Sequence, residues 1–204
     1  MSGSNRGFTL IELLIVVAII AILAAIAVPN FLEAQTRAKV SRAKADMRSL
    51  ATGVEAYSVD YNMPPLGPRQ YHAATGNFAN TLDLVVPLST PVAYITDPQI
   101  KDPFALEAGT QFPNDVQDDK FGIYRYSSVR PLSLQDDFSH MRAYEKGYDW
   151  WFYSYGPSRD AVSDNGNFRI KPKGLYAGWL PLQVYDPTNG TMSKGMIVRS
   201  NKGE

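Results

Sequence analysis

Few side chains in this sequence are spaced for acid–base, nucleophilic or metal chemistry. The two histidines, His72 and His140, lie far apart and lack the spacing of a nucleophile and its base. The chain has no cysteine, no glycine-rich phosphate loop and no spacing typical of zinc ligands. The sequence therefore predicts that the protein is not an enzyme.

One loop offers oxygen ligands for a hard cation. Residues 156–166 carry Asp160 and Asp164 between two glycines, and carboxylates in a tight turn are a type of site that calcium favours. Their spacing is not that of an EF-hand, and aspartates in such loops also form Asx turns with the local backbone. Calcium at Asp160 and Asp164 and a metal-free Asx turn are therefore both open interpretations.

Another carboxylate, Glu12, stands where a charge is costly. Residues 8–28 form a run of 21 residues in which Glu12 is the only charged side chain. A helix over this run would be about 31 Å long, which matches the hydrocarbon core of a bilayer. An uncompensated carboxylate at a bilayer centre costs at least about 2.5–3.5 kcal/mol, and less near an edge. Glu12 therefore either snorkels to the interface or has a cationic partner.

The apolar run predicts a membrane helix. A buried helix of a soluble domain is rarely apolar on every face, and the apolar region of a signal peptide is usually about 7–15 residues long. Only Arg6 precedes the run, whereas five basic residues follow it between positions 37 and 48. By the positive-inside rule alone, this distribution would place the N-terminus outside the cell.

The start of the run has a specific pattern, Gly7-Phe8-Thr9-Leu10-Ile11-Glu12. This pattern resembles the processing and methylation site of type IV prepilins and type II secretion pseudopilins. The resemblance implies that prepilin peptidase cuts after Gly7 on the cytoplasmic side and that Phe8 is then N-methylated. It implies a cytoplasmic N-terminus, against the count of flanking charges. It also places Pro29 at the position where many pilins have a proline that kinks the helix.

The resemblance gives Glu12 a role in assembly. Cleavage after Gly7 would create a cationic amine at Phe8, and Glu12 could neutralise it within one subunit or between neighbours. In a low-dielectric helix bundle, such pairing offsets a desolvation cost that neither charge could bear alone.

Later segments are similar, more loosely, to major pseudopilins. The similar segments are residues 88–94, 102–104, 124–126 and 153–156. Major pseudopilins bind calcium in a C-terminal loop, and the resemblance makes Asp160 and Asp164 the corresponding candidates.

Beyond Pro29, apolar residues recur three and four positions apart, as on one face of a helix. This apolar stripe comprises Val40, Ala43, Met47, Leu50, Val54, Tyr57 and Tyr61. The two prolines at 64 and 65 end the predicted helix. We expect the stripe to pack on a sheet of the same chain, and a homotypic coiled coil is the alternative.

The remaining sequence predicts loops and then strands. Residues 64–121 are rich in proline and glycine, with one short helix expected at 81–88. Runs of aromatic and β-branched residues predict strands at 122–127, 150–155 and 196–199, and 182–185 is expected to pair with the last of these. The polar tail, residues 200–204, is expected to fray.

These segments predict an α+β, type IV pilin-like fold. A leader (1–7) precedes a transmembrane or filament-core half-helix (8–29) and an amphipathic half-helix (30–63). The amphipathic half packs on a small antiparallel sheet in a loop-rich globular domain (64–204).

Charge and resemblance together predict the partners. Lysine plus arginine equals aspartate plus glutamate, 20 each, so no net field attracts nucleic acid. The resemblance implies a structural subunit of a type IV pilus-like filament or a type II secretion pseudopilus. Such a subunit stands first in the bacterial inner membrane, then in a periplasmic or cell-surface filament. Its partners would be further copies, other pilins or pseudopilins, prepilin peptidase, the inner-membrane assembly machinery and, before assembly, lipid.

The alternative is an extracytoplasmic sensor or binding module that keeps the helix as a permanent membrane anchor. A permanent anchor would need neither cleavage after Gly7 nor a glutamate inside the apolar run.

Overall fold

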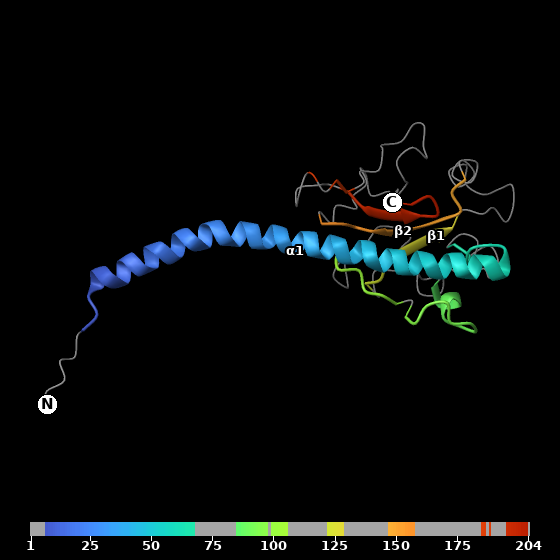
Figure 1. Cartoon of the computed structure of the whole chain (residues 1–204), viewed down its shortest axis with the longest axis horizontal. Helices are drawn as coiled ribbons and strands as arrows, with labels where there is room; N and C mark the ends of the chain where they lie inside the picture. Colours follow the sequence, from blue (N-terminus) through green and yellow to red (C-terminus); the bar gives the residue numbers. More distant parts are fainter. Residues whose placement is uncertain are drawn as a thin grey trace, which may run out of the picture.

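The computed structural model describes residues 7–67, 85–97, 99–105, 122–128, 147–157, 185–186, 188 and 195–203. Within them the chain forms one long helix, one short 3-10 helix and a three-stranded antiparallel sheet (Figure 1). The elements are α1 (Leu10–Tyr61), η1 (Val86–Leu88), β1 (Arg125–Ser128), β2 (Trp150–Ser154) and β3 (Ile197–Ser200). This arrangement confirms the predicted α+β fold.

Helix α1 ends where the sequence predicts. Its C-cap, Asn62, has φ 54° and ψ 21°, in the left-handed region that asparagine tolerates better than most residues. Pro64 and Pro65 follow, and proline cannot donate the backbone hydrogen bond that would continue the helix. A single helix therefore carries both the apolar run and the apolar stripe.

The strands follow the order β1-β2-β3, with both pairs antiparallel. Tyr126 lies opposite Phe152, which in turn lies opposite Arg199. The first strand is predicted at 122–127, but β1 begins at Arg125. Before it, Ile123 pairs with Lys101 in an isolated bridge instead of with the sheet.

Two other predicted elements lie partly outside the described residues. Of the short helix expected at 81–88, the structure describes η1, Val86–Leu88. Of the strand expected at 182–185, it describes Tyr185, whose N–H donates a 2.9 Å hydrogen bond to the carbonyl of Met196. This bond lies next to β3, where pairing was expected.

The apolar stripe of α1 packs on the sheet, as predicted. Val40, Ala43, Met47, Leu50 and Val54 are buried, Tyr57 is half-buried, and Tyr61 at the helix end is exposed. The side chains that cover the stripe include Tyr124, Tyr126, Trp150, Phe152 and Ile197. The chain's own sheet therefore covers this face of α1.

Gly53 lies inside α1, where glycine costs about 1 kcal/mol relative to alanine. A Cβ atom at this position would lie 2.5 Å from Cγ2 of Ile95. The segment that follows η1 can therefore approach the helix closely only because residue 53 has no side chain.

The second face of the sheet also carries a buried aromatic side chain. Trp151 is buried and packs with Tyr148, Tyr153 and Val198, whereas Phe152 faces the helix. This agrees with the aromatic residues that β2 carries on both faces.

The expectation that residues 200–204 fray is wrong for 200–203, and Glu204 lies outside the described residues. The N–H of Ser200 donates a 2.9 Å hydrogen bond to the carbonyl of Gly203. The Asn201 side chain donates to the carbonyl of Gly147 (3.0 Å) and the carboxylate of Asp149 (3.2 Å). The bond within the tail closes a turn, and the bonds of Asn201 hold the tail to the start of β2.

Candidate assembly site on the N-terminal helix

The N-terminus of α1 is closed by a capping box between Thr9 and Glu12. The Thr9 hydroxyl accepts a 3.3 Å hydrogen bond from the Glu12 N–H, while Oε2 of Glu12 accepts from the Thr9 N–H at 2.9 Å. The same Oε2 accepts a 2.6 Å bond from the Thr9 hydroxyl. The box satisfies backbone donors that a helix start otherwise leaves without partners. It also directs the Glu12 carboxylate back toward Phe8.

The apolar half of α1 contacts nothing else in the described structure. It projects beyond the sheet as the blue part of the helix in Figure 1. Its large apolar side chains between residues 8 and 32 are between 46% and 86% exposed, Val16 and Leu10 being the extremes. By length and composition this segment can span a membrane, and none of it is buried within the chain as a core helix would be. An apolar surface of this size needs lipid or protein to cover it.

Pro29 lies inside α1, which continues on both sides of it. Proline has no N–H, so the carbonyl four residues earlier, at Ala25, loses its helical hydrogen bond. The N-terminal part of α1 curves away from the part that carries the sheet (Figure 1).

The predicted processing residues lie at the free end of this helix. Apart from its chain neighbours, no described residue lies within 4 Å of the Cβ position of Gly7, and Phe8 is 75% exposed. The structure thus places Phe8 and Glu12 together at the exposed N-terminal end of α1. Thr9 is a partner of Glu12 that the patterns above did not predict, although a threonine three residues before a glutamate at the start of an apolar run is the capping-box signal.

The predicted calcium ligands, Asp160 and Asp164, lie outside the described residues, as do both histidines. Within the described ranges, no three histidines, cysteines or carboxylates come together where they could hold a metal ion.

Polar contacts fix the amphipathic half of α1 to the sheet. The Tyr124 hydroxyl donates a 2.9 Å hydrogen bond to Asp46, and burial raises the pKa of this hydroxyl well above its usual value. The indole Nε1 of Trp150 donates a 3.1 Å bond to Glu55. No sequence pattern predicted these pairs, because they join residues 78 and 95 positions apart.

A third polar contact lies at the other end of β2. The buried carboxylate of Asp102 accepts hydrogen bonds from the N–H of Phe104 (2.9 Å) and the hydroxyl of Ser154 (2.8 Å). Burial raises the pKa of the Asp102 carboxyl, and these hydrogen bonds oppose the rise. Asp102 therefore joins two of the segments that resemble major pseudopilins.

Comparison with known proteins points to the same end of the chain. Residues 3–28 match the family described as "Prokaryotic N-terminal methylation motif". The Type IV major pilin protein PilA of Myxococcus xanthus is 60% identical over 53 residues, which are 26% of this chain and 24% of that protein. A Fimbrial protein of Pseudomonas aeruginosa is 51% identical over 53 residues, 26% of this chain and 34% of that protein.

A third relative is the Type IV wide pilus major component PilA4 of Thermus thermophilus, 51% identical over 57 residues, 28% of this chain and 44% of that protein. The chain thus spans between 24% and 44% of the length of these curated relatives. No solved structure matches the chain.

The motif and these relatives show that the N-terminal quarter of the chain is similar to type IV pilins, and the α+β fold is consistent with that similarity. The named relatives are pilin subunits, which are structural proteins rather than enzymes.

Proposed function

We propose that this protein is a structural subunit of a type IV pilus. The observation that carries the proposal is the exposed apolar half of α1, which a capping box with a carboxylate closes at its free end. Relatives that share this half are named as major components of pili. In a filament, apolar half-helices of many copies would cover one another and remove this surface from water.

The subunit would stand in the bacterial inner membrane before it assembles. The apolar run is long enough to span the hydrocarbon core, and lipid would cover it there. Prepilin peptidase would cut after Gly7 on the cytoplasmic side, N-methylation would follow at Phe8, and the inner-membrane machinery would move the subunit into a surface filament.

Glu12 would set the register of neighbouring helices. The capping box already directs Oε2 to the backbone N–H of Thr9, one residue from the amine that cleavage would create at Phe8. A carboxylate in this position can pair with the Phe8 amine of its own chain or of a neighbour. Either pairing would offset the cost of a charge within an apolar bundle.

A type II secretion pseudopilus is the second candidate function. It is supported by the contact between Asp102 and Ser154, which joins two of the segments that resemble major pseudopilins. Such a filament would be periplasmic instead of projecting from the cell.

Electron microscopy of sheared surface fractions, with mass spectrometry of their subunit, tests the proposed function. A pilus subunit should be the main protein of thin surface filaments, and deletion of its gene should remove them. A protein that stays wholly in the membrane fraction while filaments are unaffected would instead be the permanently anchored sensor or binding module.

A further inference from the structure

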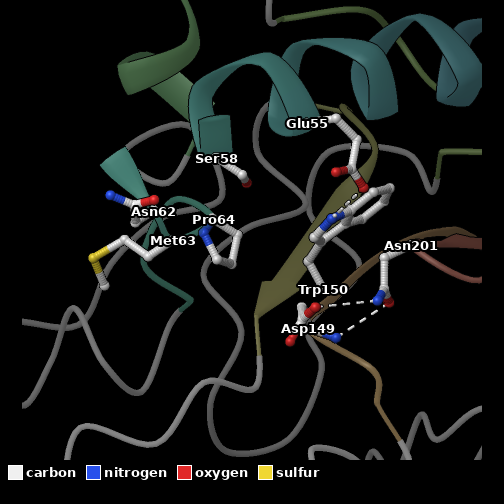
Figure 2. A pocket seen from close by; sticks show the side chains of 8 residues that line it. All are labelled: Glu55, Ser58, Asn62, Met63, Pro64, Asp149, Trp150 and Asn201. Carbon is white, nitrogen blue, oxygen red and sulfur yellow. Dashed lines mark hydrogen bonds between the residues drawn. The ribbon is translucent and has the colours of Figure 1, made fainter. Parts of the chain in front are cut away.

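A polar recess lies between the end of α1 and the start of β2, away from the candidate assembly site (Figure 2). It has a volume of about 510 Å³ and is lined by Glu55, Ser58, Asn62, Met63, Pro64, Asp149, Trp150 and Asn201. Among these, Glu55 and Asp149 are the charged residues. Among the described residues that line it, the recess therefore has two acidic side chains and no basic one.

Within the described part of the chain, each carboxylate of the recess accepts a hydrogen bond through one of its two oxygens. Oε1 of Glu55 accepts the Trp150 indole N–H at 3.1 Å, and Oδ2 of Asp149 accepts from Nδ2 of Asn201 at 3.2 Å (Figure 2). Oε2 of Glu55 and Oδ1 of Asp149 accept no hydrogen bond from any described residue. The two carboxylates are thus oriented but have acceptor capacity to spare.

The end of α1 adds to the negative potential. The last carbonyl groups of a helix lack helical partners and carry the negative end of its dipole, and the last turn of α1 has no basic residue. A side chain with several N–H donors and a positive charge is the group that this recess suits.

The chain carries such a group on the same helix. Lys39 is exposed and makes no hydrogen bond or ion pair with a described residue. Its neighbours Arg37 and Arg42 instead lie beside Glu33 and Asp46 of their own helix. Lys39 is therefore a cation available to another molecule.

We propose that the recess binds the Lys39 ammonium of a second copy of this chain, between Glu55 and Asp149. The inference rests on the proposed filament function, in which helices of many copies lie parallel. Lys39 precedes Glu55 by 16 residues, so the two copies must be displaced along the helix axis by about 24 Å. The contact would fix the relative position of neighbouring helices by charge at a second place along α1, in addition to the pairing at Glu12.

A metal ion is a poorer occupant than an ammonium. Calcium takes about 6–8 oxygen ligands, whereas the recess has two carboxylates and no third acidic residue among those that line it. An ammonium donates three hydrogen bonds, so it needs fewer acceptors than calcium does.

Crosslinking in assembled filaments tests whether the two sites meet. The chain has no cysteine, so the full-length double variant Lys39→Cys, Asp149→Cys has only the introduced thiols. A short thiol-to-thiol crosslinker is used, because a lysine–carboxylate pair holds its Cα atoms farther apart than the roughly 4.4–6.8 Å of a disulfide. The expected result is a covalent ladder of many subunits.

Three controls accompany the ladder. Each single cysteine variant should give dimers at most. The matched pair Lys39→Cys, Gln99→Cys, whose second thiol is exposed and outside the recess, should also give no ladder. Normal filaments of the Lys39→Cys, Asp149→Cys variant that yield no ladder would overturn the proposal.

A double-mutant cycle tests whether charge joins the two sites. Glu55→Gln keeps an acceptor for the Trp150 N–H and removes the charge, and Lys39→Gln removes the other charge from an exposed position. Each should lower the assembled fraction at raised salt several-fold, and the double variant should be little worse than either single one. If the loss of assembly in the double variant equals the product of the two single losses, the proposal is overturned even if a ladder forms.

Different outcomes would contradict the proposed function and the Lys39 contact. If the unmodified chain forms no filament at all, the proposed function is wrong. If it forms filaments in which the ladder or the coupling is missing, only the Lys39 contact is wrong.

Discussion

Oε2 of Glu12 accepts hydrogen bonds from both the backbone N–H and the hydroxyl of Thr9, three residues earlier. A glutamate inside an apolar run is thereby given partners within its own chain, at the exposed end of α1. Glu12 therefore has two roles, because it closes the helix end and supplies a negative charge. Suitable substitutions at position 12 can test the two roles separately.

Replacement of Glu12 by leucine should leave membrane insertion intact or improved, since a carboxylate that is costly in the bilayer is removed. Incorporation into filaments should fall by about tenfold or more, as loss of roughly 1.4 kcal/mol per contact implies. Membrane and sheared filament fractions are compared in cells without unmodified copies.

The matched control is Glu12→Gln, whose amide oxygen can still close the capping box with Thr9. If the charge matters, Glu12→Gln should fail in assembly as Glu12→Leu does. Assembly of Glu12→Gln at the level of the unmodified chain would show that the capping box matters and the charge does not.

Leu50 tests the packing of the apolar stripe on the sheet. Its side chain is 1% exposed, and Leu50→Ala should lower the free energy of unfolding by about 2–5 kcal/mol. Val59→Ala on the same helix, at a side chain 78% exposed, should change it by no more than about 0.5 kcal/mol. Urea unfolding of a fragment that begins at Asn30 provides the measurement. Equal losses for both variants would contradict the described core.

The raised pKa of Asp102 predicts that the stability of the folded chain depends on pH. Burial raises its pKa in the folded state above the ordinary value of 3.8, so the folded state binds this proton more tightly than the unfolded chain does. The contribution of Asp102 to stability is therefore fully present below pH 3.8 and is lost as the pH rises through the folded-state pKa.

Asp102→Asn should remove this loss, because asparagine still accepts from Phe104 N–H and Ser154 Oγ and is always neutral. Its melting temperature should equal or exceed that of the unmodified fragment at pH 7, and the advantage should shrink toward pH 4. Asp102→Ala should instead cost about 1–3 kcal/mol, as it leaves buried donors without a partner. An advantage of Asp102→Asn that grows toward low pH would contradict the sign of the shift.

Calcium at Asp160 and Asp164 is tested by melting the same fragment in calcium and in chelator. If calcium binds the folded state, a hundredfold excess over the dissociation constant stabilises it by about 2.7 kcal/mol. Asp160→Ala and Asp164→Ala should each abolish the difference. Equal melting temperatures would leave the metal-free Asx turn as the account of this loop.

The sequence predicts most of the helix because its signals are local. A stripe with helical period fixes the buried face of α1 from Val40 to Val54, and consecutive prolines after Met63 fix its end. The Thr9–Glu12 box is equally local and could have been predicted from the same stretch. Phe8 and Gly7 have no local physical signal of processing, and their assignment comes from resemblance.

The sheet is predicted less well because its contacts are distant in sequence. The bonds from Ser154 to Asp102 and from Asp149 to Asn201 each join residues 52 positions apart. Polarity alone made residues 200–203 look free, whereas the side chain of Asn201 supplies hydrogen bonds that a composition rule cannot foresee. The Glu55–Asp149 recess is likewise visible only in the folded chain.

Intact mass and N-terminal fragmentation of the protein recovered from its own cells test the central claim most directly. A pilin subunit processed after Gly7 should begin at N-methylated Phe8, with residues 1–7 absent. An N-terminus at Met1 or Ser2 on protein taken from sheared filaments or from the membrane would contradict the account.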